Sequence, residues 1–234
     1  MKNNSEEKII AATHLVLESA LPNVKIYGWT ETVFNQAVKS ADLGKPLVSR
    51  IFPNGLSDLV MAFYNRIDDE MLILFNSSTV DTLKYSERIS LAIKLRFKAM
   101  EPYREVTKQA IAYHAIPSHN IDGMKSLANT SNLIWEYLED TSTDFNYYTK
   151  RITLAGVIAS TTLVWVNDID NTEWPNFLNR RLKNVSAIKD IRHEANKIKE
   201  SVTQKTKSKI GSVFPSDWTG FRDILSIFSQ RSRR

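Results

Sequence analysis

The amino-acid sequence predicts an all-α protein, a helical bundle with an N-terminal helix-turn-helix and a C-terminal amphipathic helix. Two observations lead to this fold class. The 234 residues include only 7 glycines and 7 prolines, so long segments of the chain lack the residues that favour turns. Within those segments apolar residues recur at intervals of three and four, which is the spacing of one face of a helix.

Residues 1–56 are predicted to form the helix-turn-helix region. A first helix covers about 5–21, and Pro22 is expected to end it. Thr30 is a suitable N-cap for a second helix, which the turn at 42–44 connects to a short third helix over 45–51. Two helices joined by a turn of three residues are typical of a helix-turn-helix.

Residues 57–198 are predicted to form a larger helical domain. Its periodic segments lie at about 57–75, 86–100, 106–113, 123–138 and 141–166, followed by a basic helix that begins near 172 and extends to about 191. From 152 to 166 the chain carries no charge and has apolar residues all around a helical wheel. This run is shorter than the roughly 20 residues that cross a bilayer, so we interpret it as the central helix of a bundle.

The C-terminal part of the chain is basic. Residues 180–234 hold 14 Lys and Arg against 5 Asp and Glu, which leaves 17 against 21 for residues 1–179. Residues 199–213 have little periodicity and are interpreted as a tether, and 214–234 as an amphipathic, membrane-associating helix. Its apolar stripe is Trp218, Phe221, Ile224, Leu225 and Phe228. Such a stripe can also dock on its own domain, but the tether and the three terminal arginines favour an anionic membrane surface.

Residues that would carry catalysis do not form a recognisable pattern. Cysteine is absent, and so are the HExxH, GxSxG, GxGxxG and GxxxxGK motifs. The histidines are His14, His114, His119 and His193, and they include no pair four residues apart on one predicted helix. We therefore predict no catalytic residue, no cofactor and no metal site.

Several motifs together resemble one family, the accessory lipid-binding proteins of ubiquinone biosynthesis, which are similar in fold to TetR-type regulators. The motifs are Gly28-Trp29-Thr30, Phe52-Pro53-Asn54-Gly55 with Asp58-Leu59-Val60, Trp135, the run from Ser142 to Arg151, and Trp174-Pro175-Asn176-Phe177-Leu178 with Arg181-Leu182. The run from Ser142 to Arg151 is the most specific of them. The sequence differs from the family pattern at Tyr147, where many relatives have Trp, at Thr162, where they have Glu, and over 116–124.

This resemblance implies a non-catalytic protein that takes a polyprenylated quinone intermediate, or another isoprenoid lipid, from the membrane. It also implies that the protein presents this lipid to the di-iron demethoxyubiquinone hydroxylase. The surface for that enzyme would include Asp144, Asn146, Tyr147, Tyr148 and Arg151. By composition alone this block is an ordinary solvated helix start, but two adjacent tyrosines on a polar surface suit an interface.

A long isoprenoid tail requires an apolar cavity between helices. The candidate lining residues are Ile93, Phe97, Ile134, Trp135, Leu154, Ile158 and Trp165. Packing in the core would place the same residue types at the same positions. We therefore predict the lining as a set. For any one of these residues, packing in the hydrophobic core is the alternative role.

The alternative function is that of a TetR-type transcription regulator, which would bind DNA through residues 45–51. Residues 1–66 hold 7 basic against 6 acidic side chains, so they neutralise little phosphate charge. We therefore expect that the protein does not bind DNA. We also expect it to be a homodimer.

The first residues resemble neither a signal peptide nor a transit peptide. We expect a cytoplasmic protein on the bacterial inner membrane, or one on the matrix side of the mitochondrial inner membrane.

Overall fold

The computed structural model describes residues 2–80, 82–142 and 144–183. Its elements are α1 (Lys2–Tyr27), α2 (Glu31–Ser40), α3 (Lys45–Ile51), α4 (Leu56–Asn76), α5 (Tyr85–Met100), the 3-10 helix η1 (Glu101–Tyr103), α6 (Arg104–His114), α7 (Asn120–Tyr137) and α8 (Asp144–Trp165). Residues 174–183 are also helical. The ranges just given contain no strand, and the predicted all-α fold class is confirmed.

The chain divides into two compact units, the N-terminal unit of residues 1–134 and the C-terminal unit of residues 135–234. The sequence-based boundary after residue 56 falls inside the N-terminal unit, after the first residue of α4. The predicted tether over 199–213 and the predicted amphipathic helix over 214–234 lie outside the described residues. The part of the basic helix after residue 183 lies outside them as well.

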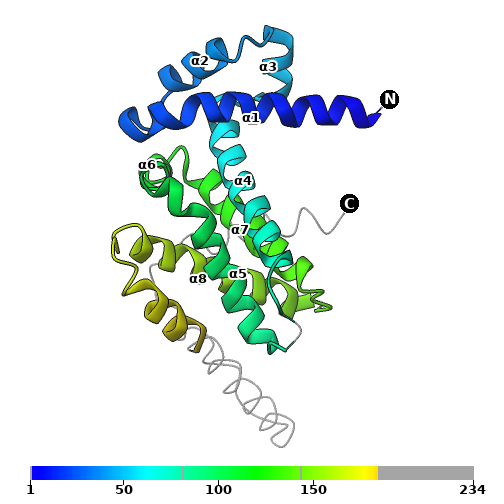
Figure 1. Ribbon diagram of the computed structural model, residues 1–234, viewed down its shortest axis with the longest axis vertical. Coiled ribbons are helices and arrows are strands. Elements are labelled where there is room, and N and C mark those ends of the chain that lie inside the picture. The colour runs from blue at the N-terminus through cyan, green and yellow to red at the C-terminus, as the bar shows by residue number, and fades with distance from the viewer. Residues whose placement is uncertain (1, 81, 143, 184–234) are drawn as a thin grey trace, which may run out of the picture. The chain divides into compact units, whose positions relative to one another are not determined.

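The second helix begins after the predicted cap, and α3 has the predicted bounds. The Thr30 side chain accepts a hydrogen bond from the Val33 backbone N–H at 3.3 Å, so the predicted N-cap of α2 is confirmed. Between α2 and α3, Asp42 adopts a positive φ of 49°, a conformation that a short polar side chain tolerates. Figure 1 shows α1, α2 and α3 together at one end of the N-terminal unit, from which α4 leads away.

The prediction that Pro22 ends the first helix is wrong, because α1 continues to Tyr27 with Pro22 inside it. A proline in a helix interior removes one hydrogen bond and costs about 3 kcal/mol. Packing offsets this cost, since Leu21 and Val24 on either side of Pro22 are 6% and 0% exposed. Burial of these apolar side chains extends the helix past a residue that local preference would make its end.

The corner between α3 and α4 depends on one glycine and one carboxylate. Gly55 has φ 59° and ψ −125°, which is accessible to glycine and strained for other residues. Asp58 accepts hydrogen bonds from the Asn54 backbone N–H at 2.6 Å and from its Nδ2 at 3.1 Å. Phe52 packs edge-on against Phe34 of α2 with ring centroids 5.6 Å apart. These contacts explain the Phe-Pro-Asn-Gly motif as a fold-determining corner.

The core of the N-terminal unit forms around α4, which packs on α1, α2 and α5. Its inward residues Leu59, Val60, Phe63, Ile67 and Met71 are fully buried. Trp29, in the connection between α1 and α2, lies 5.6 Å from the Phe63 ring and donates its Nε1–H to the Val106 carbonyl at 3.3 Å. One tryptophan thus fastens the helix-turn-helix to both α4 and α6.

Candidate functional site

The candidate site is the corner where the chain leaves α7 and enters α8, in the C-terminal unit. Most of the uncharged part of α8 is buried, with Leu154 3%, Ile158 0% and Trp165 0% exposed, whereas Leu163 is 55% exposed. Its polar side chains are satisfied within the helix, because the hydroxyls of Ser160, Thr161 and Thr162 each donate to the carbonyl four residues earlier at 2.7–2.8 Å. Hydroxyls bonded in this way can be buried at little cost.

The first turns of α8 carry the predicted partner surface. Asn146 is exposed, and Tyr147 and Tyr148 are half-buried. The two tyrosine rings pack edge to face, with centroids 5.2 Å apart and planes at 82°. Such a pair offers a partner a large aromatic contact area. Asp144 is the first residue of α8, but its side chain lies outside the described part of the structure.

Arg151, the fifth predicted partner residue, is buried. Its side chain is 2% exposed, and its guanidinium carbon lies 3.4 Å from the centroid of the Tyr147 ring. It donates hydrogen bonds to the Tyr147 carbonyl at 3.3 Å and to Oδ2 of Asp140 at 3.4 Å. The structure therefore places Arg151 beneath the aromatic pair.

Asp140 links the two helices at this corner. Its side chain, 3% exposed, accepts hydrogen bonds from Lys150 Nζ at 2.6 Å and from the Ser142 hydroxyl at 2.7 Å. Lys150 also contacts the Ser142 hydroxyl and lies 5.0 Å from the centroid of the Trp135 ring. Burial raises the pKa of the Asp140 carboxyl, but the hydrogen bonds from Lys150 and Ser142 and the Lys150 charge outweigh it, so the net pKa is lowered.

Sequence reasoning identified the aromatic residues of this corner but missed Asp140 and Ser142 as members of it. Asp140 is eleven residues before Arg151, and the connection between α7 and α8 separates them. The sequence places several acids before the consecutive cations Lys150 and Arg151, and it does not single out Asp140 among them. No helical spacing joins these groups, so their contact depends on how the connection folds back.

The predicted lipid-lining residues are all buried. Ile93, Phe97 and Ile134 belong to the N-terminal unit, and Trp135, Leu154, Ile158 and Trp165 belong to the C-terminal unit; each is at most 4% exposed. A packed core and an apolar pocket both bury such side chains. Their role in lipid binding stays a prediction.

Other site classes can be described only within residues 2–80, 82–142 and 144–183. Over these ranges no three His, Asp or Glu side chains gather closely enough to hold a metal ion. The same ranges contain no helix with the length and apolarity to cross a bilayer.

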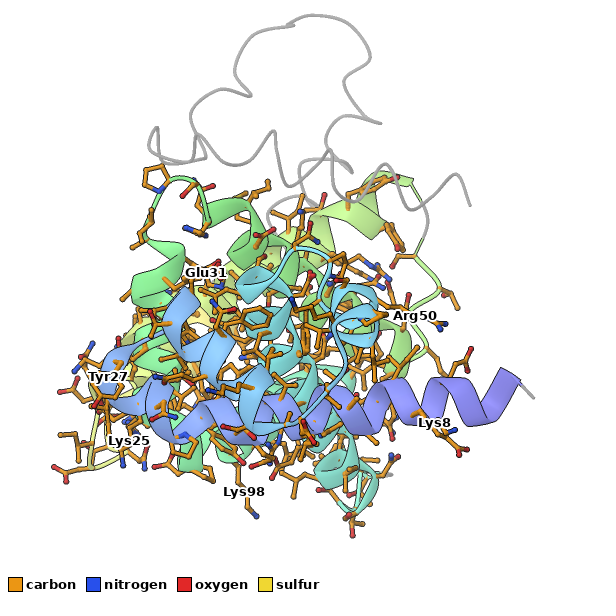
Figure 2. The ribbon with its side chains drawn as sticks, turned by 90° about the horizontal axis from the view of Figure 1, so that it is seen from above. Lys8, Lys25, Tyr27, Glu31, Arg50 and Lys98 are labelled. Atoms are coloured by element: carbon orange, nitrogen blue, oxygen red, sulfur yellow. The ribbon has the colours of Figure 1, made fainter. Side chains whose placement is uncertain are left out.

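The predicted membrane residues Trp218, Phe221, Ile224, Leu225 and Phe228 lie outside the described residues. The helix-turn-helix leaves Lys45, Ser49 and Arg50 of α3 exposed, and Figure 2 labels Arg50 there.

Comparison with known proteins agrees with the motifs. Residues 121–189, which include the corner just described, match the family model of COQ9. The ubiquinone biosynthesis protein COQ9 of Rattus norvegicus is 27% identical over 206 residues, which are 84% of this chain and 64% of that protein. The Homo sapiens protein is 28% identical over 207 residues, covering 84% and 63%. The Schizosaccharomyces pombe protein is 27% identical over 201 residues, covering 82% and 77%.

The chain thus spans 63–64% of the length of the rat and human relatives. The matched segment includes both the aromatic run at the start of α8 and Asp140, the residue that links α7 to it. By the match over residues 121–189 and by these curated relatives, the chain is similar to the COQ9 ubiquinone biosynthesis proteins.

Proposed function

We propose that this protein is a non-catalytic accessory protein of ubiquinone biosynthesis. In this proposal it binds a polyprenylated quinone intermediate, or another isoprenoid lipid, at the membrane and presents it to the di-iron demethoxyubiquinone hydroxylase. Its relatives are named ubiquinone biosynthesis proteins, which supports the pathway. The observation that carries the partner assignment is the edge-to-face pair of Tyr147 and Tyr148 on the first turns of α8.

The aromatic pair suits a protein interface because of its surroundings. Tyrosine supplies a large contact area with few rotatable bonds, and it is enriched at interfaces. The cations next to the pair, Lys150 and Arg151, are directed at Asp140. Asp140 balances one of the two positive charges, and both cations donate to its carboxylate, so a partner can cover the tyrosines without desolvating a cation that lacks a carboxylate neighbour.

The partner assignment is tested by replacing Tyr147 and Tyr148 with Glu and measuring co-purification with the hydroxylase. A buried carboxylate at an apolar contact is costly, so we expect co-purification to be lost while circular dichroism and the melting temperature stay close to those of the parent. Tyr27→Glu is the matched control, because Tyr27 is 66% exposed at the end of α1 (Figure 2). Co-purification that survives both substitutions at the corner would refute the assigned interface.

Lipid binding is the second part of the proposal. Native mass spectrometry of protein expressed with membranes should detect co-purified isoprenoid or phospholipid. A spectrum that contains only the bare protein, under conditions that retain lipids on a control carrier, would contradict the proposal.

Attachment to an anionic membrane is the third part. The helix over 174–183 presents exposed Arg180, Arg181 and Lys183, and both guanidinium groups lie over the Phe177 ring, at 5.9 and 4.8 Å. This basic segment precedes the predicted tether and membrane helix. Flotation of the full chain with anionic liposomes, beside a truncation at Gly211, tests the attachment. We expect the full chain to float and the truncated chain to float less, and equal flotation would count against the membrane helix.

A further inference from the structure

Arg151 lies in an unusual position for a residue of a partner surface. Its guanidinium carbon lies 3.4 Å from the centroid of the Tyr147 ring, and only 2% of its side chain is exposed. A guanidinium over an aromatic face is attracted by the ring quadrupole and fixes the plane of that ring. A partner that docks on Tyr147 would therefore meet the ring and not the arginine.

Asp140 holds this arginine from outside α8. Its Oδ2 accepts from Arg151 at 3.4 Å, while its Oδ1 accepts from Lys150 at 2.6 Å. The carboxylate is in the connection between the helices, whereas both cations are on the second turn of α8. This arrangement ties the connection to the helix and directs the Arg151 guanidinium under the ring.

The orientation of Tyr147 also determines that of its neighbour. Tyr148 packs edge to face on Tyr147 at 5.2 Å, a geometry that depends on the plane of the first ring. A rotation of the Tyr147 ring would therefore change the surface that both tyrosines present. The same three groups, one carboxylate, one guanidinium and one ring, thus determine the shape of the whole aromatic pair.

We infer that Arg151 and Asp140 are positioning residues, which hold Tyr147 in the orientation that the partner binds while Arg151 itself makes no contact with the partner. The inference rests on the proposed function, since it takes the aromatic pair to be the surface for the hydroxylase. It differs from a purely structural role in one respect. The effect of Arg151 on partner affinity must pass through the Tyr147 side chain.

A double-mutant cycle on affinity for the purified hydroxylase tests this requirement. The variants of the full chain are Arg151→Met, Tyr147→Ala and the double variant, and their Kd values are measured by biolayer interferometry. We expect Arg151→Met and Tyr147→Ala each to weaken binding by about tenfold or more, and the double variant to bind about as weakly as Tyr147→Ala alone. Arg66→Met is the matched control, because Arg66 lies 5.1 Å from the Tyr103 ring in the N-terminal unit. It should leave the Kd unchanged.

Two conservative variants keep the test decisive if Arg151→Met fails to fold. Arg151→Lys retains a cation for Asp140 but loses the flat guanidinium, so we expect a near-parental melting temperature with reduced affinity. Asp140→Asn should reduce affinity in the parent and leave it unchanged in the Tyr147→Ala background. Either variant can replace Arg151→Met in the cycle.

The possible outcomes separate the two proposals. Additive losses in the cycle would mean that Arg151 acts independently of Tyr147, which overturns the positioning role. Full affinity in Arg151→Met beside weak binding by Tyr147→Ala would also overturn it, and the proposed partner surface would stand. Full affinity in Tyr147→Ala would instead refute the partner surface on which the inference rests.

Discussion

Arg96 of α5 donates its Nε–H to Oδ1 of Asp68 on α4 at 2.9 Å, and the two side chains are only 2% and 7% exposed. Thr130 of α7 donates its hydroxyl to the other carboxylate oxygen at 2.6 Å. The Nη1 of Arg96 lies 3.0 Å from the Met100 sulfur, which is a weak acceptor. A charged pair at the centre of the N-terminal unit thus joins three helices that are separated in the sequence.

Removing one member of this pair should be strongly destabilising. Asp68→Ala leaves the Arg96 charge buried without its carboxylate, and breaking such a pair costs about 3–5 kcal/mol. Urea denaturation of the two chains measures the difference. Asp68→Leu combined with Arg96→Met should recover much of the loss, because apolar side chains can replace a buried ion pair. Glu101→Gln controls for the loss of an exposed pair with Arg104 at 2.9 Å, with an expected cost of at most about 1 kcal/mol.

Gly123, in the first turns of α7, should not tolerate a methyl group. A Cβ at this position would lie 2.8 Å from Cγ and 3.1 Å from Cβ of His114, closer than carbon atoms pack. Alanine normally stabilises a helix relative to glycine by about 1 kcal/mol, but the overlap reverses the sign, and we expect Gly123→Ala to destabilise by about 1–3 kcal/mol. Thermal unfolding measures the change.

A second variant shows whether the overlap is the cause. In a His114→Ala background the 2.8 Å contact with Cγ is gone and only the 3.1 Å contact with Cβ remains, so Gly123→Ala should cost much less stability there. A similar loss of stability in both backgrounds would contradict the steric explanation.

Because of His114, the free energy of unfolding should decrease as the pH falls below 6.5. Its ring stacks on Tyr64 with centroids 5.8 Å apart, and Nδ1 lies 2.9 Å from the His119 carbonyl. Burial lowers its pKa from 6.5 despite the His119 carbonyl and the nearby Asp122, which both raise it; the charge of His119 lowers it further. Below pH 6.5 the unfolded chain therefore binds this proton more readily than the folded chain, and the folded state loses stability until the pH passes the folded pKa.

The unfolding free energy at pH 7.5 and at pH 5.5 tests this sign. We expect His114→Gln to reduce the difference between the two values relative to the parent, because glutamine does not titrate. His14→Gln is the control for removing a histidine from an exposed position on α1. A pH dependence unchanged by His114→Gln would show that other groups cause it.

The Thr30 cap should contribute modestly to α2. Thr30→Ala removes the acceptor for the Val33 backbone N–H and is expected to cost about 1 kcal/mol. Thr30→Ser retains an acceptor oxygen at the same place and should cost much less. Chemical denaturation of both variants checks the order, and equal losses would mean that the threonine methyl, not the cap, stabilises the helix.

Much of the helical architecture could be predicted because it depends on short-range features. The apolar spacing in α4 and α5 and the Thr30 cap fall within a few residues of the elements that they define. Pro22 is the exception, since burial of Leu21 and Val24 outweighs a local preference against the helix. That Leu21 and Val24 are buried is known only from the packing of the core, and the sequence around Pro22 does not reveal it.

For the candidate site, the sequence by itself determined which residue types begin α8 and, through its motifs, which family the chain resembles. Only the tertiary structure decided how those residues are used. Tyr147 and Tyr148 reach the surface, whereas Arg151 turns inward to Asp140, eleven residues earlier and outside the helix. The physical reason is that helical periodicity relates side chains three or four residues apart. Burial and charge pairing between more distant groups depend on how the connecting segment brings them together.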